Sequence, residues 1–133
     1  MDIRYLSTDL DIESLSELSL VVDDLGEDVL VQHHGPVKHF NHASFVIAHS
    51  SYSGPDEVVD GFCNLIEYLS PETRAIWDTC FTRVFDIGFE WGSTPSRYRF
   101  ELRPSTIERV AKIGASVAVS LYPPREQEPN HDA

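Results

Sequence analysis

The chain of 133 residues has little cysteine, few basic residues and no long apolar run. Its two cysteines, Cys63 and Cys80, do not form a Cys-x-x-Cys pair. Neither a disulfide framework nor a zinc site is therefore expected, and both residues are predicted to be packed as free thiols. The chain has no apolar run of about 18 residues, and segment 1–4 has no signal-peptide core. These absences predict a cytoplasmic protein that does not bind a membrane.

Catalytic motifs are also missing. The sequence has no Gly-x-Ser-x-Gly, no P-loop and no Gly-x-Gly-x-x-Gly. The paired carboxylates Asp23-Asp24 and Asp56-Glu57 fall in a predicted turn and in the first turn of a predicted helix. Solvation and the helix dipole account for them there, without an acid–base role. We therefore expect a protein that is not an enzyme and uses no cofactor.

Acidic residues, in contrast, are abundant and unevenly placed. The net charge is −12, from 22 acidic and 10 basic side chains. Residues 1–37 contribute −8, residues 38–80 contribute −4, and residues 81–133 are neutral. Such a field repels nucleic acid and anionic membranes and attracts a basic partner.

The length predicts one domain over residues 1–122, followed by a disordered tail over 123–133. Alternating apolar residues, helix-start signals and Gly/Pro breaks predict both strands and helices. Strands are expected at 1–7, 29–31, 44–48, 85–89, 98–102 and 117–121, and helices at 10–19, 55–69, 71–77 and 105–113. Period-two strands imply one wet sheet face, so the predicted fold class is α+β, a two-layer sandwich with a largely antiparallel sheet and helices packed on one face.

The order of these signals resembles a bacterial family of domains of unknown function, numbered 4279. The matching stretches are Asp9–Leu15, Leu65–Pro71 and Leu102–Ala115, the last followed by a hydrophobic strand ending at Tyr122. The resemblance implies a fold and no activity, so it assigns no functional residue.

Five of the six histidines lie within 17 residues: His33, His34, His39, His42 and His49. Imidazole is a common metal ligand and titrates near physiological pH. No Asp, Glu or Cys lies between residues 29 and 55, so a metal would need carboxylates from elsewhere or histidines alone. Solvated loop and strand histidines are the ordinary explanation, and pH-sensitive contact with a partner is a third.

The arginines of the second half present a similar choice. A phosphate-binding patch would use Arg83, Arg97, Arg99, Arg103 and Arg109. The structural alternative is that Arg97 and Arg99 form cross-strand ion pairs with acids such as Asp86 and Glu90 on the wet face. The neutral charge of this half favours the structural alternative.

Size, acidity and the missing motifs predict a non-enzymatic acidic protein-binding domain. The specific hypothesis is an immunity protein that neutralises a basic toxin domain, such as a nuclease. The expected partner contacts are Asp23, Asp24, Glu27, Asp28, Asp56, Glu57 and Asp60, with Tyr52 and Trp91 as aromatic anchors. The alternative is a metal- or small-ligand-binding domain, or an enzyme, centred on His33–His49 with Arg97 and Arg99. A third hypothesis is that the acidity serves only solubility.

Overall fold

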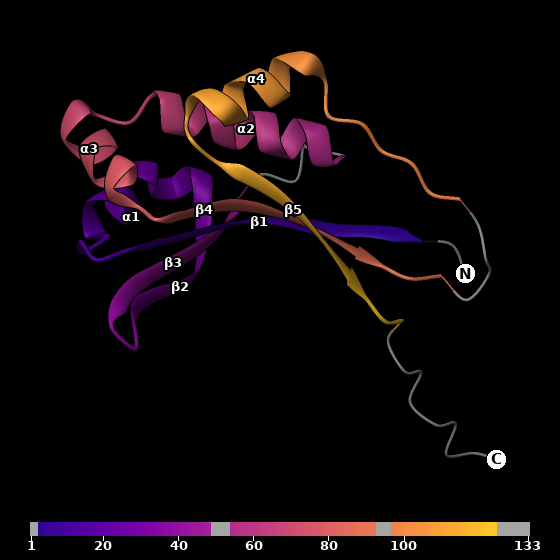
Figure 1. The fold of residues 1–133 in the computed structure, drawn as a ribbon, viewed down its shortest axis with the longest axis horizontal. Helices are drawn as coiled ribbons and strands as arrows, with labels where there is room; N and C mark the ends of the chain where they lie inside the picture. Colours follow the sequence, from indigo (N-terminus) through magenta and orange to yellow (C-terminus); the bar gives the residue numbers. More distant parts are fainter. Residues whose placement is uncertain (1–2, 49–53, 93–96, 125–133) are drawn as a thin grey trace.

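A computed structural model describes residues 3–48, 54–92 and 97–124. In these residues, helices cover one face of a five-stranded sheet, as Figure 1 shows, and the predicted two-layer α+β class is confirmed. The elements are β1 (Arg4–Ser14), α1 (Ser19–Leu25), a 3-10 turn η1 (Gly26–Asp28), β2 (Val29–Val37), β3 (Phe40–Ile47), α2 (Pro55–Glu67), α3 (Pro71–Thr79), β4 (Thr82–Glu90), α4 (Pro104–Lys112) and β5 (Ser116–Tyr122).

The sheet has the strand order β2-β3-β1-β4-β5, so β1 is the central strand. All neighbours are antiparallel except β4 and β5, which are parallel and joined through α4. A parallel pair requires such a crossover, because a tight turn cannot return the chain in the same direction. The core lies between the sheet and the helices and includes Leu10, Phe45, Phe62, Phe85 and Ile87.

The predicted helix at 10–19 is wrong. Strand β1 continues to Ser14, and its buried Leu10 and Ile12 alternate with the partly exposed Asp9 and Asp11. Pairing with both β3 and β4 outweighs the local helix-start signal, because a central strand gains hydrogen bonds and packing on both edges. The first helix instead begins at Ser19 and contains Val21 and Val22.

Two further expectations near turns are corrected. Gly35 and Pro36 do not break the chain but lie inside β2, where an edge strand tolerates a missing amide hydrogen. Residues 98–102 form no strand. They cross one end of the core, where Phe89 packs against the rings of Tyr98 and Phe100, with both centroid distances 5.1 Å.

The helices at 55–69, 71–77 and 105–113 are confirmed within a few residues, and so is the strand at 117–121. The sequence Ser105-Thr106-Ile107-Glu108 has the form of a capping box, which predicts a helix start at Ser105. That prediction is wrong, since α4 begins at Pro104 with Arg103 as its N-cap. Ser53, whose hydroxyl the sequence predicts as the cap of the helix at 55–69, and the tail from residue 125 lie outside the described residues. No helix in the described part of the chain is long and apolar enough to cross a membrane.

Candidate functional site on the open face of the sheet

One face of the sheet carries no helix in the described parts of the chain, and we call it the open face (Figure 1). It is polar because β1 alternates: Leu10 and Ile12 point into the core, so the residues between them point the other way. Register places acidic side chains from two strands together on this face: Asp9, Asp11 and Glu13 of β1, and Asp86 of β4.

Asp9 and Asp86 are direct cross-strand partners. The Asp9 Oδ1 atom is buried and has no hydrogen-bond partner. Burial is the main cause of the raised pKa of Asp9, and the charges of Asp11 and Asp86 raise it further, whereas a hydrogen bond from Ser7 partly opposes the shift. Burial also raises the pKa of Asp11, although the nearby His42 partly opposes the shift. Like charges at this spacing destabilise the folded protein.

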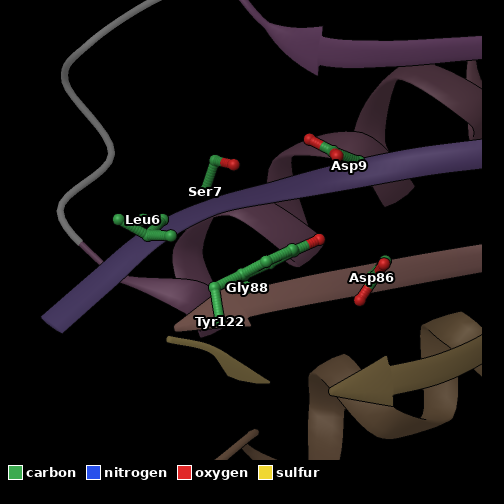
Figure 2. A pocket seen from close by; sticks show the side chains of 6 residues that line it. All are labelled: Leu6, Ser7, Asp9, Asp86, Gly88 and Tyr122. Atoms are coloured by element: carbon green, nitrogen blue, oxygen red, sulfur yellow. The ribbon is translucent and has the colours of Figure 1, made fainter. Parts of the chain in front are cut away.

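A pocket of about 210 Å³ opens beside these carboxylates. Its lining, drawn in Figure 2, is Leu6, Ser7, Asp9, Asp86, Gly88 and Tyr122. Gly88 leaves room for the Tyr122 ring, since an added Cβ would lie 3.2 Å from the Cε2 atom of that ring. Ser120 donates a hydrogen bond of 2.7 Å to Asp86 Oδ1 and orients that carboxylate. The pocket therefore presents one apolar wall and two carboxylates.

Two of the five clustered histidines also reach the open face. The Nδ1 atoms of His33 and His42 lie 2.8 Å apart, so one of these two nitrogens donates a hydrogen bond to the other. The other nitrogen of His42 lies 3.4 Å from Asp11 Oδ1. His34 points to the opposite side and contacts Glu17 at 3.1 Å.

The histidines of the predicted segment do not all lie together in the part of the chain that the structure describes. His39 makes no contact with the His33–His42 pair that the structure records, and His49 lies outside the described residues. Among the described residues, no three His, Cys, Asp or Glu side chains are grouped so as to hold a metal ion. The metal-site alternative stays a prediction.

Several of the predicted partner contacts have structural roles. Asp56 accepts hydrogen bonds from the Arg103 amide at 2.8 Å and from Arg103 Nε at 2.7 Å, and so caps α4 from α2. Burial acts to raise the pKa of Asp56, but the hydrogen bonds from Arg103 and Thr106 and the charge of Arg103 together outweigh it, so the net shift is downward. Asp60 pairs with Arg109 Nη1 at 2.5 Å. These two acids help to hold α2 against α4.

The acids around α1 lie on a second surface. Asp23 and Asp24 belong to α1, and Glu27 and Asp28 to η1, not to the predicted open turn. Asp24 accepts a hydrogen bond of 3.0 Å from the Ser70 amide, which is the main cause of its lowered pKa. A shallow groove of about 260 Å³ lies here between α1 and α3.

The remaining predicted contacts do not form one site with the acids of either surface. Glu57 is exposed on α2, and Trp91 is 55% exposed just after β4. Tyr52 lies outside the described residues. The structure therefore does not bring the predicted contact set together.

The arginines also have internal partners. Arg83 donates to the Gly114 carbonyl at 2.9 Å, and Arg109 bridges Asp60, Asn64 and Glu67 of α2. The predicted cross-strand pairs are wrong in detail, because Arg99 pairs with Glu101 in the same segment. The acid Glu90 pairs instead with Arg4 at 2.7 Å.

The open-face carboxylates were missed from the sequence as a site. Their signal was the alternation of Asp9, Asp11 and Glu13 with Leu10 and Ile12, which the helix prediction obscured. Comparisons with family models, with curated proteins and with solved structures find no match to this chain.

Proposed function

We propose that the protein is a non-enzymatic, acidic protein-binding domain whose open face receives a basic partner. The observation that supports this is the placement of Asp9, Asp11, Glu13 and Asp86 on the open face. None of them forms an ion pair with Lys or Arg among the described residues. Lysines or arginines from a partner would supply the missing countercharge and relieve the repulsion between these groups.

The specific form of the proposal is an immunity protein that neutralises a basic toxin domain, such as a nuclease. A row of carboxylates on a sheet presents repeated negative charge, as a polyanion does, and can occlude a basic active site. The surplus acidity would also speed association with such a target. The same charge disfavours nucleic acid and anionic membranes as partners.

The experiment compares two doubly substituted proteins of equal net charge. One is Asp9→Asn/Asp86→Asn on the open face, and the other is Asp23→Asn/Glu27→Gln on the α1 surface. Each is tested for binding to the product of the adjacent gene, at about 50 and about 300 mM salt. We expect the open-face variant to bind at least about tenfold more weakly, because it loses charges inside the interface. The α1 variant should bind nearly as well as the original protein.

Each other result has a distinct meaning. Equal weakening of both variants would show that only net charge matters. Weakening of the α1 variant alone would move the interface to that surface. Binding that ignores salt, or no binding, would refute the electrostatic proposal and favour acidity as a solubility device. Calorimetric titration with zinc tests the alternative at the histidines.

A further inference from the structure

The two edges of the sheet differ in how they are protected against pairing. Edge strand β2 contains Gly35 and Pro36, and its register with β3 shifts between Val31 and His33. A proline and a bulge are standard devices that prevent an edge from pairing with another strand. Edge strand β5 has neither: its sequence Ser-Val-Ala-Val-Ser-Leu-Tyr contains no charge, no proline and no glycine.

Strand β5 is also exposed over most of its length. The side chains of Val117, Val119 and Leu121 are 39%, 50% and 59% exposed, although they lie on the same sheet face as the core residues of β4. In Figure 1 the second half of β5 runs out beyond the helices. An exposed, uncharged edge strand rich in residues that favour β structure can pair with another strand through its free backbone groups.

The backbone of β5 shows which groups point outward. The Tyr122 carbonyl accepts a hydrogen bond of 2.9 Å from the Trp91 amide, so Tyr122 bonds toward β4. Backbone groups alternate in direction along a strand. The N–H and C=O groups of Val117, Val119 and Leu121 therefore point away from β4, where the described chain places no further strand.

We propose that β5 pairs antiparallel with β5 of a second copy of this chain, about a two-fold axis at Val119. This register opposes Val119 to its own copy and Val117 to Leu121. All three outward-facing residues then form hydrogen-bonded pairs, giving about six backbone hydrogen bonds. Their side chains lie on one face and form a continuous apolar strip. The strand is thus complementary to itself in both backbone and side chains.

Charge supports a second copy as the occupant. The acidic surplus lies before residue 81, whereas residues 81–133 are neutral and β5 itself is uncharged. A strongly basic partner would find no countercharge on this strand. At physiological salt the screening length is about 8 Å, which limits repulsion between the more distant acids of the two copies.

The experiment measures the mass of the whole chain by sedimentation equilibrium. The original protein is expected to be a concentration-dependent dimer. Val119→Lys places two ammonium groups opposite each other at the axis and should raise the dimer dissociation constant at least about tenfold. Leu30→Lys is the matched control, because Leu30 is 58% exposed on the other edge. It should leave that constant unchanged.

A second variant tests the register without depending on disruption. In Val119→Cys the two new thiols face each other across the axis, within reach of a disulfide. Oxidised glutathione should convert this variant to a covalent dimer, whereas Val117→Cys should cross-link poorly because it faces Leu121. Circular dichroism and thermal melting confirm that each variant folds.

Three results would overturn the proposal. They are a monomer at all concentrations, a dimer disrupted by Leu30→Lys but not by Val119→Lys, or no cross-link in the Val119→Cys variant. A monomer that dimerises only after removal of residues 125–133 would show that the chain covers its own edge, and would also overturn it. Higher salt should leave the affinity of the two copies for each other unchanged or raise it, whereas it should weaken binding to the proposed basic partner. The two proposals can therefore fail separately.

Discussion

Asp9 on β1 and Asp86 on β4 are directly paired neighbours on adjacent strands, and both lie on the face of the sheet that the helices leave open. Ser120 hydrogen-bonds to Asp86, but Asp9 Oδ1 is buried without a partner. The folded protein therefore keeps two carboxylates together at a cost in stability. Basic side chains of the partner that we propose would reduce this cost.

Replacing Asp9 by Asn should stabilise the protein by about 0.5–1 kcal/mol at pH 7, because it removes one of two opposed like charges. The raised pKa of Asp9 means that the folded state binds this proton more tightly than the unfolded state does. The cost is therefore full above the raised pKa and absent below the unfolded value of 3.8.

Urea unfolding of the original protein and the variant from pH 7 to pH 4 measures this difference. The gap in unfolding free energy should shrink as the pH falls. Asp23→Asn removes the same charge at an exposed position of α1, and it should show no such gap. A destabilised Asp9→Asn variant would mean that the hydrogen bond from Ser7 outweighs the repulsion from Asp86.

Replacing Arg109 by Met should destabilise the protein by about 1–2 kcal/mol, since it strips Asp60 and Glu67 of their shared partner at the α2–α4 contact. The matched control is Lys112→Met on the same helix. Lys112 pairs with Glu108 at 3.0 Å, but both side chains are mostly exposed. That change should cost less than about 0.5 kcal/mol by thermal or urea unfolding.

The same cluster should make the protein sensitive to acid. The hydrogen bond from Arg109 is the main cause of the lowered pKa of Glu67. The contribution of the ionised Glu67 to stability is fully present above 4.5, the pKa of Glu67 in the unfolded chain. This contribution is lost as the pH falls through the lower pKa that Glu67 has in the folded protein. Unfolding curves below pH 4.5 should therefore show a smaller loss of stability in Arg109→Met than in the original protein.

Trp77→Phe should cost about 2 kcal/mol, from a lost hydrogen bond and a cavity in the core. Trp77 is fully buried, and its Nε1 donates to the Ile113 carbonyl at 2.9 Å, tying α3 to the end of α4. Trp91→Phe, at the exposed tryptophan, should change the free energy of unfolding by less than about 0.5 kcal/mol. Equal effects of the two substitutions would contradict the assigned role of Trp77.

The thiols of Cys63 and Cys80 should react slowly with Ellman's reagent in the native protein. Burial is the main cause of the raised pKa of each, to about 12 for Cys63 and about 11 for Cys80. Both should react at once in urea, because unfolding restores solvent and an ordinary thiolate fraction. A Leu30→Cys variant, substituted at a side chain that is 58% exposed on β2, supplies the fast-reacting control thiol. Fast labelling of the unsubstituted protein would contradict the burial.

Local patterns predicted much of the fold. The apolar faces of α2 and α4 lie where their helical spacing indicated, and Gly114 takes the positive φ that follows a helix end. The error at 10–19 arose because Thr8 and Asp11 imitate a helix start, while the alternation of Leu10 and Ile12 continues a strand. Only pairing on both sides of β1 decides between the two patterns.

The candidate site was less predictable. Asp56 and Asp60 were expected to meet a partner, yet they meet Arg103 and Arg109, which are more than 40 residues away in the sequence. No local pattern indicates which distant charges will be neutralised. Asp9 and Asp86, in contrast, become neighbours only through strand register.

The sequence by itself determined the composition of the protein: an acidic first half, a neutral second half, two buried thiols and an α+β pattern. These features depend on residue type and on short-range periodicity. The tertiary structure decided which acids are paired internally, which share the open face and which edge of the sheet stays unprotected. Those outcomes depend on strand order and register, through which residues far apart in the chain become neighbours or remain exposed.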